Sequence, residues 1–164
     1  MLYVGLGIVH ILSGSDHLAF LFALLLLARS LGEVATLASG FTIAHSVTLA
    51  LAVFGAVRPE PAAVEILIGF SIALVAAENG WLLAGRDRAI AVACVAALLA
   101  ATVASAFGLG LLAWQAWLGA ALFSACHFGW LSIEERPARL RAAVAFAFGL
   151  LHGFGFAGAL MEIE

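Results

Sequence analysis

The sequence predicts an all-α, polytopic membrane protein: a single domain over residues 1–164, built as a bundle of about six transmembrane helices. Hydrophobic residues make up 65% of the chain and the mean hydropathy is +1.17. Only 10% of the residues are charged, against about 25% in ordinary soluble domains. A soluble fold of this size has too few polar groups to cover so apolar a surface. The net charge of -3 also excludes the basic face that a nucleic-acid-binding protein needs.

Six apolar stretches are long enough to cross a bilayer, which takes about 20 residues per helix. Charged or Pro-containing segments separate most of them, and a Gly-rich segment divides the long uncharged run from Ala89 to Ser132. The predicted helices are residues 2–28, 35–57, 62–84, 89–107, 111–132 and 140–161. The breaks between them are, in chain order, Arg29, Arg58–Pro61, Gly85–Arg88, Gly108–Gly110 and Glu134–Pro137.

All the basic residues are Arg, and they are unevenly placed. The loops after the first, third and fifth predicted helices hold every Arg except Arg58. Cytoplasmic loops of membrane proteins carry an excess of Arg and Lys. This pattern predicts cytoplasmic odd-numbered loops and extracytoplasmic termini in a bacterial-type inner (plasma) membrane. The Arg residues on the predicted cytoplasmic side are Arg29, Arg86, Arg88, Arg136, Arg139 and Arg141.

Ionisable side chains lie inside the predicted helices, where each costs at least about 2.5 kcal/mol and usually marks a functional bundle interior. They are His10, Asp16, His17, His45, Glu78, His127 and His152. Depths estimated from the helical rise place His10, His45 and His152 in an upper layer and the other four in a deeper one. Two such layers are typical of a path for an ion. The alternative for any single His is a hydrogen bond that joins two helices.

Two short segments bear on this arrangement. A weak point at Ser13-Gly14-Ser15 would let the first helix unwind and swing Asp16 inward, as broken helices do in transporters. Gly149 and Gly153 form a GxxxG pair, which allows close helix packing. That pair has two interpretations: a packing face alone, or a contact that brings His152 against the first two helices.

Imidazole and carboxylate groups suit nickel, cobalt, zinc, copper or iron. The two Cys residues are isolated, so a divalent first-row ion is a better fit than Cu(I). A His ligand usually donates its second ring N–H to a nearby acceptor. The candidate acceptors are Ser13, Thr42, Ser46, Asn79 and Ser124.

Three blocks of sequence resemble the HupE/UreJ family of membrane proteins: GIVHILSGSDHL at 7–18, FTIAHSVTL at 41–49 and LHGFGFA at 151–157. Glu78-Asn79 also fits, and the resemblance covers nearly the whole chain, closest to the HupE/UreJ-like branch. It implies an inner-membrane protein that carries nickel, or cobalt, for metalloenzyme maturation. It also implies that His10, Asp16 and His17 are metal ligands, with His45 contributed by the second helix. The motif His-x5-Asp-His is similar to the His-x4-Asp-His motif of nickel/cobalt transporters.

The first hypothesis is therefore a permease or channel, rather than an enzyme, whose His, Asp and Glu side chains pass a divalent ion across the bilayer. A second is an intramembrane metalloenzyme that holds zinc or iron with Glu78 as general base, although no HExxH motif is present. A third is a non-catalytic scaffold or metal-sensing partner. The expected partners are the lipid bilayer and the metal ion, with a homo-oligomer or an extracytoplasmic partner domain left open.

Overall fold

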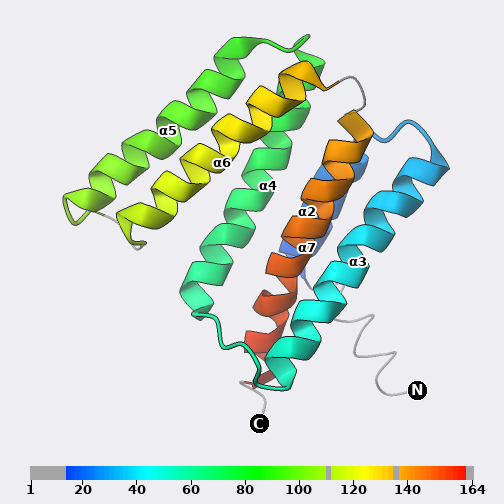
Figure 1. The fold of residues 1–164 in the computed structure, drawn as a ribbon, viewed down its shortest axis with the longest axis vertical. Coiled ribbons are helices and arrows are strands. Elements are labelled where there is room, and N and C mark those ends of the chain that lie inside the picture. The colour runs from blue at the N-terminus through cyan, green and yellow to red at the C-terminus, as the bar shows by residue number, and fades with distance from the viewer. Residues whose placement is uncertain (1–13, 110–111, 135–136, 162–164) are drawn as a thin grey trace. The chain divides into compact units, whose positions relative to one another are not determined.

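The computed structural model describes residues 14–109, 112–134 and 137–161. This part of the chain is helical throughout, and the prediction of a helical membrane protein is confirmed (Figure 1). Four of the described helices, α3 to α6, are long and apolar enough to cross a membrane. The helices are α2 (Ser15–Leu25), α3 (Leu31–Val53), α4 (Pro61–Leu83), α5 (Arg88–Ala106), α6 (Trp114–Ile133) and α7 (Pro137–Met161).

The chain forms two compact units. Unit 1 comprises residues 1–72 and 141–164, and unit 2 comprises residues 73–140. Unit 1 therefore contains α2, α3, the first half of α4 and most of α7. Unit 2 contains the rest of α4 together with α5 and α6.

In unit 1, α2 and α3 form an antiparallel pair joined by a short turn. The Ser30 Oγ accepts a hydrogen bond from the Glu33 backbone N–H at 3.1 Å. The Glu33 carboxylate in turn accepts one from the Arg29 backbone N–H at 2.9 Å. This reciprocal cap satisfies free N–H groups at the helix start. As a result α3 begins at Leu31, four residues earlier than the hydrophobic pattern alone predicts.

The backbone of α7 lies directly against α3. A Cβ atom added at Gly149 would lie 2.6 Å from the Phe41 carbonyl oxygen and 2.9 Å from the Ala44 Cβ. A Cβ added at Gly153 would collide with the His45 carbonyl oxygen and with the Thr48 Oγ1. The GxxxG pair is therefore the contact face between these two helices, since only glycine leaves room for this approach.

Arg141 does not lie in a loop, because α7 begins at Pro137, a residue well suited to the first helical position. Its side chain is buried, with 3% of its surface exposed. The Arg141 Nη2 donates a hydrogen bond to the Leu24 carbonyl oxygen at 2.6 Å, and Nη1 lies 3.8 Å from the Glu33 Oε1. This cation therefore ties the start of α7 to the end of α2 and the start of α3.

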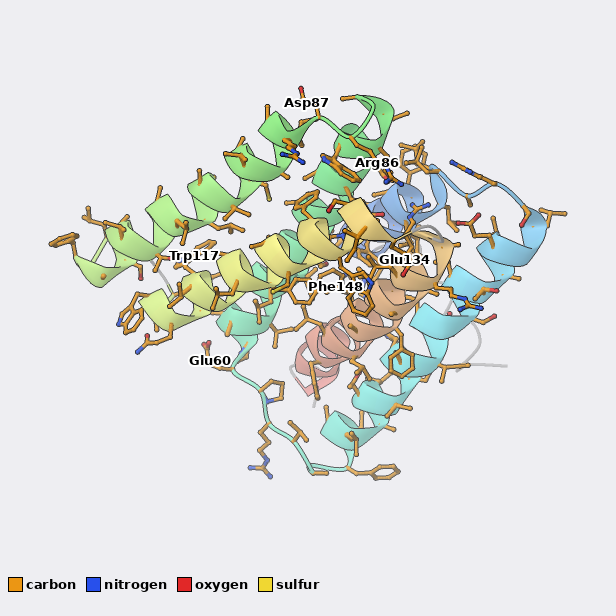
Figure 2. All side chains as sticks on the ribbon, turned by 45° about the horizontal axis from the view of Figure 1, so that its top comes forward. Glu60, Arg86, Asp87, Trp117, Glu134 and Phe148 are labelled. Atoms are coloured by element: carbon orange, nitrogen blue, oxygen red, sulfur yellow. The ribbon has the colours of Figure 1, made fainter. Side chains whose placement is uncertain are left out.

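In unit 2, α5 and α6 run side by side as an antiparallel hairpin (Figure 1). Figure 2 shows Arg86 and Asp87 in the turn that leads into α5, with Trp117 near the start of α6. The Asp87 carboxylate caps α5 by accepting a hydrogen bond from the Ala89 N–H at 2.9 Å. The described part of α5 has no buried residue although the helix is strongly apolar, which fits a helix that faces lipid.

Candidate metal site

Unit 1 brings together three imidazole rings from three helices: His17 on α2, His45 on α3 and His152 on α7. The His17 ring centroid lies 5.1 Å from that of His45 and 5.0 Å from that of His152. His152 is fully buried, and the other two are partly buried. The contact of α7 with α3 thus also brings His152 against the first two helices, as the second interpretation of the GxxxG pair expects.

This arrangement corrects the predicted depth layers. Counting the helical rise from residue 2 places His17 in the deeper layer, apart from His45 and His152. The helix that carries His17 starts only at Ser15, and the preceding Gly14 has non-helical angles (φ -77°, ψ 82°). The assumption of one continuous rod from residue 2 therefore gave the wrong depth for His17. His17 lies in the same layer as His45 and His152.

A hydrogen-bond chain fixes the orientation of His152. The Ser71 Oγ donates its single proton to the Ile68 carbonyl oxygen at 2.6 Å. The Ser71 Oγ also lies 3.0 Å from the His152 Nε2. With the hydroxyl proton directed at that carbonyl oxygen, the Ser71 Oγ can accept a hydrogen bond from the His152 Nε2–H. A neutral His152 then carries its lone pair on Nδ1, which is buried and has no hydrogen bond within the described part of the chain.

Ser71 is the residue that the sequence reasoning missed. It is not among the candidate acceptors for a His ligand that the sequence offered. The available signal was a hydroxyl in the middle of an otherwise apolar helix. Two of the candidates that were named, Thr42 and Ser46, are exposed, and Ser46 donates to the Thr42 carbonyl oxygen at 2.8 Å.

Aromatic rings enclose the three histidines on one side. The Phe20 ring lies 4.8 Å from the His152 ring, and the Phe41 ring lies 5.3 Å from it. Phe41 also stacks on His45 at 5.9 Å. These phenylalanines are almost entirely buried. The site is therefore partly walled by apolar groups, where polar interactions are stronger than in water.

The imidazole rings stand edge to face, at interplanar angles of 78° for His17 with His45 and 89° for His17 with His152. Over the described residues, no group of three or more His, Cys, Asp or Glu side chains is already arranged to hold a metal ion. A metal bound here would therefore require the rings to rotate until their nitrogens converge. The donor set itself, imidazole nitrogen, suits divalent first-row ions.

Asp16, the other described residue that was predicted as a ligand on the first helix, is not part of this cluster. Asp16 lies in the first turn of α2 with an exposed side chain, 3.4 Å from the Ser15 hydroxyl. It has not swung into the helix bundle as a broken helix would allow. His10 and Ser13 lie outside the described residues.

Unit 2 holds a second buried polar group, a pair formed by Glu78 on α4 and His127 on α6. The Glu78 Oε2 lies 2.9 Å from the His127 Nε2, and both side chains are 2% exposed. The Phe123 ring stacks on the His127 ring at 6.3 Å and 3°. Asn79 and Ser124, two of the predicted acceptors, are also buried. Both members of the pair were predicted from the sequence, but their direct contact was not.

The class of protein is now defined: a helical membrane protein with a histidine cluster and an imidazole–carboxylate pair inside its apolar helices. A family model described as HupE / UreJ protein matches residues 1–112. The match covers more than half of the chain, so the protein belongs to the HupE/UreJ family, as the sequence blocks indicated. No curated protein and no solved structure matches the chain. The matched region includes His17, His45 and Glu78, whereas His127 and His152 lie beyond it.

Proposed function

We propose that this protein is a membrane permease or channel for a divalent transition-metal ion, and that nickel or cobalt is the preferred ion. The metal-binding groups are His17, His45 and His152, which form the histidine cluster of unit 1. One observation carries the proposal: three imidazoles from three separate helices meet inside an apolar bundle, and the buried His152 Nδ1 has no hydrogen-bond partner among the described residues. Membership of the HupE/UreJ family, whose members are linked to nickel and cobalt, supports the choice of metal.

The geometry of the cluster favours transit over permanent retention. Over the described residues, no group of three or more potential ligands is already arranged to hold a metal ion. Conduction requires a site that is favourable enough to enter and weak enough to leave. The rings must also rotate to bind, which costs part of the binding free energy. Asp16, exposed one residue before His17, would offer a carboxylate to the arriving cation.

The Glu78–His127 pair is proposed as a second transient binding site for the same ion, because it joins a carboxylate to an imidazole within apolar helices. His10 stays a candidate ligand through the family motif. The Arg-rich loops are proposed to be cytoplasmic, in an inner membrane, which gives both termini an extracytoplasmic position.

Uptake of radioactive nickel into proteoliposomes tests the function. We expect the parent protein to admit nickel down its gradient, and a His17→Ala/His152→Ala variant to fall to the level of protein-free vesicles because two of the three imidazoles are gone. The matched control is Ser46→Ala on α3, whose exposed hydroxyl donates to the Thr42 carbonyl oxygen of the same helix and which should transport like the parent.

Equal uptake by the parent and the double His variant would contradict the proposal. So would a tightly held metal that stays bound through purification and does not exchange with added nickel. That second outcome would favour the intramembrane metalloenzyme, whose metal must stay in place during turnover.

A further inference from the structure

The core of unit 1 is built in layers, each one helical turn from the next. A phenylalanine lies one helical turn from each histidine, on the side of Arg141. The pairs are His17 with Phe20, His45 with Phe41 and His152 with Phe148, three or four residues apart. The phenylalanine follows the histidine in sequence on α2 but precedes it on α3 and α7, because α2 runs antiparallel to those two helices. We call these three residues the phenylalanine layer.

Within the phenylalanine layer, the Phe20 ring contacts the other two rings, and the Phe20 and Phe41 rings contact His152. The Phe20 ring lies 5.3 Å from Phe41 and 5.9 Å from Phe148. It also lies 4.8 Å from the His152 ring. Phe20 itself is fully buried. The layer therefore covers the histidine cluster on one side with packed aromatic surface.

One turn further on, three aliphatic side chains continue the same faces. Leu24, Leu37 and Val144 are at most 5% exposed. Beyond them lies Arg141, hydrogen-bonded to the Leu24 carbonyl oxygen at 2.6 Å and 3.8 Å from the Glu33 carboxylate. The sequence of layers is thus imidazole, phenylalanine, aliphatic and guanidinium.

A hydrated cation meets two obstacles on this route. Hydrophobic constrictions close pores by excluding water, and two apolar layers stand between the histidines and the Arg141 end. Arg141 then places a permanent positive charge at that end, and Glu33 is the carboxylate beside it. On the other side of the phenylalanine layer, His17 and His45 are themselves partly exposed, whereas Leu37 is fully buried.

We propose that the phenylalanine layer and Arg141 are the gate of the metal pathway on its Arg-rich side, and that this structure holds the gate closed. The proposal rests on the function proposed above. Phe20 is the central residue, because it contacts both other phenylalanines and His152. Opening requires the rings to separate and Arg141 to release the Leu24 carbonyl and Glu33, so that the start of α7 moves away from α2 and α3.

Cysteine labelling tests the gate without any metal. In a background with Cys94→Ala and Cys126→Ala, single cysteines are placed by His45→Cys in the histidine cluster or by Leu37→Cys beyond the phenylalanine layer. A small cationic methanethiosulfonate reagent is added to one side of the membrane at a time. We expect His45→Cys to be labelled from the side away from Arg141, and Leu37→Cys to be protected from both sides.

Adding Phe20→Ala should expose Leu37→Cys to the reagent on the side that already reaches His45→Cys. The matched control is Phe22→Ala on the same helix, because Phe22 is 69% exposed and faces away from the layers. It should leave Leu37→Cys protected. Phe148→Ala carries the same test if Phe20→Ala does not accumulate in the membrane.

Labelling of Leu37→Cys in the parent background at the rate of His45→Cys would overturn the gate. Continued protection after both Phe20→Ala and Phe148→Ala would overturn it too. A second arm follows downhill nickel entry, which Phe20→Ala should accelerate while Phe22→Ala leaves it unchanged. If no variant moves nickel, the proposed function fails, yet the labelling still decides whether the layer excludes water and solutes.

Discussion

Replacing Gly153 by Ala should lower the free energy of unfolding by about 3 kcal/mol, the upper end of the usual cost of overpacking. The new Cβ would press on the His45 carbonyl oxygen and the Thr48 hydroxyl. A backbone carbonyl in a helix cannot rotate away, so α7 must move off α3. Because His152 is the preceding residue, the same movement should separate it from His17 and weaken nickel binding. Thermal unfolding of the purified protein in detergent measures the first effect, and nickel titration the second.

The control uses the same substitution where there is space. Within the described part of the chain, nothing lies within 4 Å of a Cβ built at Gly69 or at Gly40. Gly69→Ala and Gly40→Ala should therefore be neutral, or stabilising by up to about 1 kcal/mol through helix propensity. If Gly153→Ala unfolds at the same temperature as Gly69→Ala, the close contact between α7 and α3 is wrong.

The second large effect concerns the buried pair of unit 2. His127→Ala should reduce the free energy of unfolding by about 3–5 kcal/mol, because it leaves the Glu78 carboxyl buried without its imidazole partner. Cys126→Ala, an exposed neighbour on the same helix, should change stability by no more than about 0.5 kcal/mol. Chemical or thermal unfolding of the two variants in one detergent gives the comparison.

The double variant Glu78→Leu/His127→Leu distinguishes the cost of leaving one partner unpaired from the cost of losing the pair as a whole. Replacing both members of a buried pair with apolar residues is often nearly neutral. We therefore expect the double variant to be more stable than His127→Ala alone. If the double variant loses at least as much free energy of unfolding as Glu78→Leu and His127→Leu lose together, the two side chains do not stabilise each other.

The fold class followed from the sequence because lipid imposes a simple rule: a spanning segment must be apolar and helical. The lengths of the apolar stretches were therefore enough to predict the helices. It could not find their starts, which depend on caps and polar side chains. Glu33 was treated as part of a loop, yet its carboxylate caps α3. Arg141 was treated as a loop cation, yet it is buried against the Leu24 carbonyl oxygen.

The candidate site was predictable in its members but not in its grouping. Imidazoles in apolar segments stand out in any hydropathy profile, so His17, His45 and His152 were found from their positions inside the predicted helices. Their common layer depends on where each helix begins and on how closely α7 approaches α3. Counting residues along the chain gives neither the helix starts nor the distance between α7 and α3. Ser71 was missed for a related reason: its role exists only because α7 brings His152 within 3.0 Å of it.

X-ray absorption spectroscopy of nickel bound to the purified protein tests the central claim most directly, since it counts imidazole ligands on the metal itself. We expect three imidazole nitrogens on the nickel in the parent protein and in Ser46→Ala, and one fewer in His152→Ala. A bound nickel with no imidazole ligand, or with the same number in the parent and in His152→Ala, would contradict a metal site at His17, His45 and His152.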